Sequence, residues 1–137
     1  IDPSEDSDGL LLRRAIARAQ LLDAGDASQR GPLREEIRTL EQRFAAEQAR
    51  GGLLHRREAA MLALRVQGDI ETALWLAREN FREQREPLDA RLLLAAALVA
   101  AEPAAAAEAV AWFKEHNIED VRLQPIVDAL LRLAATP

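Results

Sequence analysis

The sequence contains no cysteine and no tyrosine, and aromatic residues make up only 4% of its 137 residues. Without cysteine, the chain has no disulfides, no thiolate nucleophile and no cysteine-based metal site. Residues that suit strands are scarce, whereas Ala and Leu, both strong helix formers, dominate the apolar part of the sequence. The composition therefore predicts an all-α fold.

The sequence also lacks an excess of basic residues. It has 18 Lys and Arg against 23 Asp and Glu, which gives a formal net charge of −5. Proteins that bind nucleic acid normally present a strongly basic face to the phosphates, so this balance disfavours a nucleic-acid partner. No apolar run approaches the roughly 20 residues needed to span a bilayer, and we expect no direct membrane insertion.

Residue patterns that would indicate catalysis are missing. The three serines all fall in predicted loops or in the N-terminal tail, and Gly51-Gly52 has no lysine beside it that could belong to a phosphate-binding loop. His55 and Glu58 are spaced like half of a di-metal motif, but the sequence has no second pair of this kind. We therefore predict a protein that is not an enzyme, with no metal site and no cofactor.

Hydrophobic periodicity predicts seven helices joined mostly by turns of a few residues. Residues 1–8 are acidic and polar, and we expect them to form a flexible segment that ends at Asp8, the predicted N-cap of the first helix. Gly51-Gly52 and Gly68 are predicted helix stops, and Asp69 is predicted to cap the helix that follows. Short turns make neighbouring helices antiparallel, so the pattern predicts stacked helical hairpins.

An internal repeat distinguishes such a stack from a closed bundle. A shift of 34 residues places Ala63 on Ala97 and Leu64 on Leu98. This period, together with the segment Gly68-Asp69-Ile70-Glu71-Thr72-Ala73-Leu74 and the later Pro87, resembles the tetratricopeptide repeat (TPR) family. The stretch 57–89 also looks like uncharacterised bacterial TPR-containing proteins. Because such proteins are often exported, the resemblance favours the periplasm or cell envelope over the cytoplasm.

The resemblance implies a right-handed superhelical stack of antiparallel helix hairpins within a domain that spans residues 9–137. The expected parts are three hairpins and a C-terminal capping helix, at about 9–50, 54–85, 88–117 and 120–135. In such an array the first helix of each hairpin lines a concave surface that can hold a peptide or a partner helix.

Candidate binding residues are those predicted to face this concave surface. Arg14, Arg18 and Arg65 would form a basic strip for a carboxylate or an acidic segment, although solvated helix-face arginines are the simpler interpretation. The full predicted groove comprises Arg14, Arg18, His55, Glu58, Arg65, Leu92 and Ala96. Asp89 and Val99 are predicted to lie on the same exposed face, and Trp112 in the core. For Trp75, a partner anchor and a core residue remain alternatives.

The sequence thus predicts a non-catalytic scaffold that binds a protein or peptide through the concave face of a TPR-like array. The alternative is a structural or assembly domain that packs on the remainder of a longer cell-envelope protein. A regulatory domain that contacts nucleic acid is a third possibility, disfavoured by the acidic balance.

Overall fold

The computed structural model describes residues 3–50, 55–116 and 122–135, and all regular structure in these ranges is helical. The prediction of an all-α protein is confirmed for this part of the chain. The α-helices are α1 (Pro3–Asp23), α2 (Arg30–Ala49), α3 (Arg56–Leu62), α4 (Ile70–Glu83), α5 (Pro87–Val99), α6 (Ala107–Glu115) and α7 (Gln124–Ala134). Three short helical segments lie between the α-helices: the 3-10 helices η1 (Ala27–Gln29) and η3 (Pro103–Ala106), and the π-helical η2 (Ala63–Gln67).

The chain divides into two compact units, Ile1–Gly68 and Asp69–Pro137. The boundary falls inside the segment 54–85, so the two helices of that predicted hairpin belong to different units. Gly51-Gly52, predicted to end a helix, lies outside the described residues, as do the ends of the predicted ranges at 54, 117 and 120.

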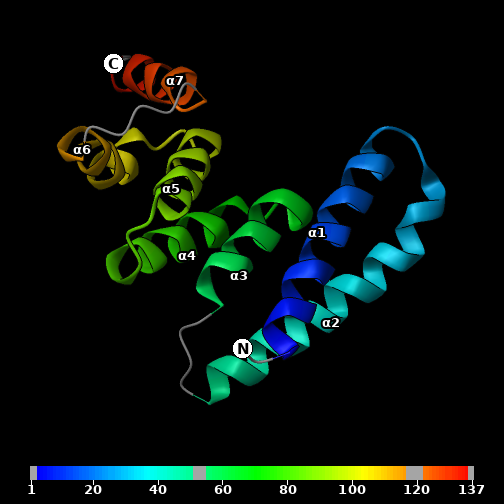
Figure 1. Cartoon of the computed structure of the whole chain (residues 1–137). Helices are drawn as coiled ribbons and strands as arrows, with labels where there is room; N and C mark the ends of the chain where they lie inside the picture. The colour runs from blue at the N-terminus through cyan, green and yellow to red at the C-terminus, as the bar shows by residue number, and fades with distance from the viewer. Residues whose placement is uncertain (1–2, 51–54, 117–121, 136–137) are drawn as a thin grey trace. The chain divides into compact units, whose positions relative to one another are not determined.

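The first unit is organised around α1. Helices α1 and α2 run antiparallel and pack against each other, and α1 also contacts α3 and η2 (Figure 1). A shared core joins these elements: it consists of Leu12, Ala15, Ala19, Leu33, Leu40 and Leu62. The small residues Ala15 and Ala19 lie one turn apart on α1 and let the neighbouring helix approach closely.

The start of α1 differs from our expectation of a flexible segment over residues 1–8. The helix begins at Pro3, and proline is favoured in the first turn of a helix. Asp8 is therefore inside the helix and is not its N-cap. Its side chain is buried and forms an ion pair with Arg43 of α2. This ion pair accounts for an acidic residue at a buried position of the helix.

The second unit is organised around α5, which packs against α4, α6, η3 and α7. Helices α4 and α5 run antiparallel (Figure 1). Because α5 has neighbours on several sides, it is apolar nearly all round: its buried residues include Leu92, Leu93, Leu94, Ala96 and Ala97. Leu92 and Ala96 were predicted to face the concave groove, and this prediction is wrong because both belong to the core.

Local chemistry explains where α4 begins. Gly68 adopts the left-handed conformation (φ 67°) that ends η2, and this backbone geometry favours glycine. Asp69 is the N-cap of α4, as predicted, and its side chain accepts a hydrogen bond from the Thr72 backbone N–H at 3.2 Å.

Asp89 is fully buried, although its position on α5 was predicted to be exposed. Its carboxylate accepts hydrogen bonds from the Asn80 side-chain amide of α4 (2.7 Å) and from the backbone N–H of Glu86 (3.2 Å). Asn80 is itself only 2% exposed. One carboxylate therefore stabilises the start of α5 and joins it to α4, and hydrogen bonds compensate for its burial.

We expect the Asp89→Ala substitution to lower the free energy of unfolding by about 2 kcal/mol, because it leaves the buried Asn80 amide and the Glu86 N–H without their acceptor. Asp89→Asn retains one acceptor oxygen and should cost less. Urea unfolding followed by circular dichroism measures both. Equal stability of Asp89→Ala and the parent chain would contradict this role.

The C-terminus of α5 contains a strained residue. Ala101 has a positive φ of 56°. The Ala101 N–H donates to the Leu98 carbonyl (3.1 Å) and the Glu102 N–H to the Ala97 carbonyl (3.0 Å). This pair of hydrogen bonds is the Schellman arrangement, which usually has glycine where this chain has Ala101.

Glycine at this position should relieve the strain, so we expect Ala101→Gly to raise the free energy of unfolding by about 0.5–1 kcal/mol. The neighbouring Ala100 has a right-handed helical backbone (φ −74°) and is the matched control. Ala100→Gly should lower stability by about 0.5 kcal/mol. Stabilities that change in the same direction for both variants would rule out strain at Ala101.

Candidate functional site

The basic residues predicted to form a strip have different environments. Arg14 and Arg65 are exposed, on α1 and η2 respectively. Arg18 instead forms an ion pair with Glu36 of α2 and donates a hydrogen bond to the Gln29 side-chain oxygen at 2.7 Å. Glu36 is only 8% exposed, so Arg18 neutralises a buried carboxylate and joins α1 to α2. We therefore assign Arg18 a structural role.

The turn that brings α2 back along α1 is stabilised by Asp26, the N-cap of η1. Hydrogen bonds from the Ser28 hydroxyl, the Gln29 amide and the Ser28 backbone N–H lower the pKa of the Asp26 carboxyl. Asp26 lies on the surface, and its hydrogen bonds order the turn from which Gln29 reaches Arg18.

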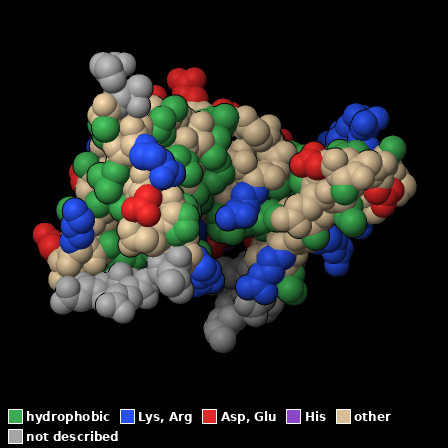
Figure 2. All heavy atoms as spheres, turned by 90° about the horizontal axis from the view of Figure 1, so that it is seen from above, with side chains coloured by type: hydrophobic (Ala, Val, Ile, Leu, Met, Phe, Trp, Pro, Cys, Tyr) green, Lys and Arg blue, Asp and Glu red, His purple; other side chains and the backbone are tan. Residues whose placement is uncertain are grey.

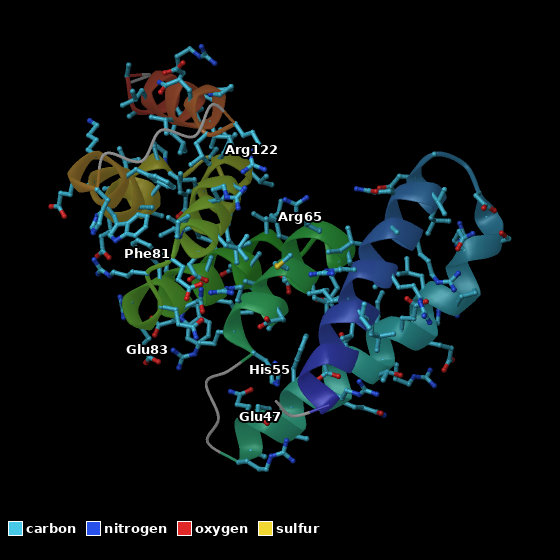
Figure 3. All side chains as sticks on the ribbon, in the orientation of Figure 1. Glu47, His55, Arg65, Phe81, Glu83 and Arg122 are labelled. Atoms are coloured by element: carbon cyan, nitrogen blue, oxygen red, sulfur yellow. The ribbon has the colours of Figure 1, made fainter. Side chains whose placement is uncertain are left out.

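His55 and Glu58, two of the predicted groove residues, are both half-buried. His55 precedes α3, and its ring lies 5.8 Å from the ring of Phe44. One carboxylate oxygen of Glu58 is buried, and no residue in the described part of the chain donates a hydrogen bond to it. His55 and Arg65 lie at opposite ends of the helical segment that α3 and η2 form (Figure 3). In the described ranges, no group of three or more His, Asp or Glu side chains is arranged to hold a metal ion.

A surface groove occurs elsewhere, between the first half of α4 and the end of α5. It has a volume of about 540 Å³. Its apolar lining comprises Ile70, Leu74, Trp75, Val99 and Ala100. Trp75 is 59% exposed and Val99 is 53% exposed, so two large apolar side chains of this lining remain accessible to solvent.

Charged residues surround this apolar lining. Glu71 and Arg78 of α4 and Glu102 after α5 line the same groove, and all three are exposed. Since α4 and α5 are antiparallel, Glu102 lies at the end of the groove where α4 begins, as does Glu71. Arg78 lies two helical turns further along α4. The groove thus has an acidic end and a basic end.

The two tryptophans have contrasting environments. Trp112 is in the core, as predicted: it is 9% exposed, and its ring meets Phe81 edge-on at 6.1 Å and Phe113 edge-on at 5.4 Å. His116 lies at the C-terminus of α6 with its ring 4.6 Å from Trp112. Trp75 is exposed, so of the two alternatives that the sequence left open for it, a core position is excluded.

On the face drawn in Figure 2, Lys and Arg side chains are interspersed with acidic and hydrophobic ones. Of the helices that the structure describes, none combines the length and the apolar character needed to cross a membrane.

Comparison of the chain with protein-family models, with curated proteins and with solved structures gives no match.

Single-tryptophan variants test the two environments. In Trp112→Phe the remaining Trp75 should be quenched efficiently by acrylamide, and in Trp75→Phe the remaining Trp112 should be protected and emit at shorter wavelength. Trp112→Ala should cost about 3 kcal/mol or more of stability, and Trp75→Ala about 0.5 kcal/mol or less. Equal quenching of the two variants in dilute solution would contradict this assignment.

Proposed function

We propose that this chain is a non-catalytic, TPR-like scaffold that binds protein through the groove between α4 and α5. The observation that carries the proposal is Trp75, which projects a large, exposed apolar surface from a groove lined by further apolar residues and bordered by charges of both signs. Protein interfaces combine these features: an aromatic centre, an apolar surround and a polar rim.

The packing of the second unit supports the repeat interpretation. Helix α5 contacts α4 before it and α6 after it, and α7 packs on α5 as the first helix of a following hairpin would. We propose that these helices belong to a right-handed superhelical stack. The sequence period of 34 residues, which places α3–η2 on α5, supports the same arrangement.

The dimensions of the groove suit a helix or a short extended segment. From Ile70 to Arg78 the axis of α4 rises about 12 Å, which corresponds to two turns of a facing helix. The predicted concave face fits less well, because Leu92 and Ala96 are buried and Arg18 is paired with Glu36. The proposal therefore places binding at Trp75 rather than along the basic strip.

Site-specific photo-crosslinking tests the proposed function. A benzoylphenylalanine in place of Val99, at the edge of the groove, should give a discrete crosslinked protein product under native conditions. The same probe in place of Ala111, which is exposed on α6 outside the groove, should not. Adding Trp75→Ala to the Val99 probe should abolish the product, because the substitution removes the aromatic anchor while the chain stays folded.

Circular dichroism serves as the control that each of these variants remains folded. Products that are the same from positions 99 and 111, or a product from position 99 that survives Trp75→Ala, would refute binding at this groove.

A further inference from the structure

Three exposed residues of α4 form a stripe with a regular order. Glu71, Trp75 and Arg78 follow at spacings of four and three residues, so their side chains lie on one face of the helix. The acidic and basic residues lie nearly equidistant from the tryptophan, one on each side. All three line the groove, and Ile70 and Leu74 flank the stripe on the same helix.

The charges of this stripe have no partner within the described part of the chain. No ion pair joins Glu71, Arg78 or Glu102 to another described residue, whereas neighbouring charges do pair: Arg82 with Glu79 at 2.9 Å and Arg85 with Glu108 at 3.6 Å. The groove therefore presents one cation and two carboxylates that are available to a binding partner.

We propose that the occupant of the groove is a second copy of this chain, with α4 packed antiparallel against α4 of the other copy about a two-fold axis at Trp75. This inference rests on the proposed function, because it assigns a partner to the same groove. A two-fold axis reverses the direction of the helix, so it brings Glu71 of each copy opposite Arg78 of the other. The surface is complementary to itself, as an isologous interface requires.

The remaining groove residues fit this arrangement. The two Trp75 rings would meet near the axis and be removed from water, with Val99 beside them. Glu102 lies at the acidic end and supplies a second carboxylate toward the incoming Arg78. A partner that carries charge of one sign only would be repelled at the end of the groove that has the same sign. A second copy meets opposite charge at both ends.

Charge reversal gives a sharp test by analytical ultracentrifugation over a wide range of concentration. The parent chain should show a reversible dimer of its 15.1 kDa monomer. Glu71→Arg places two arginines opposite each other at both ends of the interface, and Arg78→Glu does the same with two glutamates. Each substitution should raise the dissociation constant about tenfold or more.

Two combinations should restore association. The double variant Glu71→Arg/Arg78→Glu is again self-complementary at positions 71 and 78 and should dimerise more tightly than either single variant, although more weakly than the parent because Glu102 then faces a glutamate. An equimolar mixture of the two single variants should form a heterodimer, because one copy carries arginine at both positions and the other carries glutamate at both. Rescue of this kind does not occur if the substitutions act only by destabilising the monomer.

Matched controls are Glu115→Arg and Lys114→Glu, which make the same charge changes on the exposed last turn of α6 and should leave the dissociation constant unchanged. In Trp112→Phe, quenching of Trp75 by acrylamide should decrease as the concentration rises. A parent chain that stays monomeric up to near-millimolar concentration, or association unaffected by either reversal, would overturn the inference.

The result also separates this inference from the proposed function. A monomeric chain that still gives a Trp75-dependent crosslink to a different protein would refute only the second copy as occupant. A monomeric chain that gives no such crosslink would refute both proposals.

Discussion

Burial of α5 is the constraint on which the second unit depends. A helix that is apolar nearly all round is stable in water only when neighbours cover it, and α4, α6, η3 and α7 do so. The start of α5 is polar for a specific reason: Asp89 accepts hydrogen bonds from Asn80 of α4 and from the backbone at Glu86, and so fixes the connection between the two helices. The position of α4 against α5 then determines the groove, because its lining comes from these two helices and the residues that follow α5.

Features set by neighbouring residues could be predicted from the sequence. The all-α class follows from the Ala- and Leu-rich composition, and the start of α4 follows from Gly68 and Asp69, whose effects act within one helical turn. Burial of Trp112 was also predicted. The sequence contains a signal for the burial of Leu92 and Ala96 as well, since the run from Leu92 to Ala97 has no polar residue. These two residues were nevertheless predicted to be exposed, because the expected TPR-like array has a solvent-facing side on this helix.

The remaining features depend on contacts between distant residues. Arg18 and Glu36 are separated by the whole turn between α1 and α2, and their pairing depends on the path of that turn through Asp26. Asp8 meets Arg43 for the same reason. The groove needs α4 and the end of α5 to lie side by side, so the spacing of Glu71, Trp75 and Arg78 could show a stripe but not the surface beside it.

The distribution of aromatic residues has a consequence for spectroscopy. Both tryptophans lie in the second unit, and the chain has no tyrosine. Intrinsic fluorescence therefore monitors residues 69–137 and gives no direct signal from Ile1–Gly68, whose core consists mainly of aliphatic side chains with Phe44 packed against it. A single sharp transition in tryptophan emission would describe one half of the chain. Only a probe of the backbone, such as far-ultraviolet circular dichroism or amide hydrogen exchange, shows whether the two units unfold together.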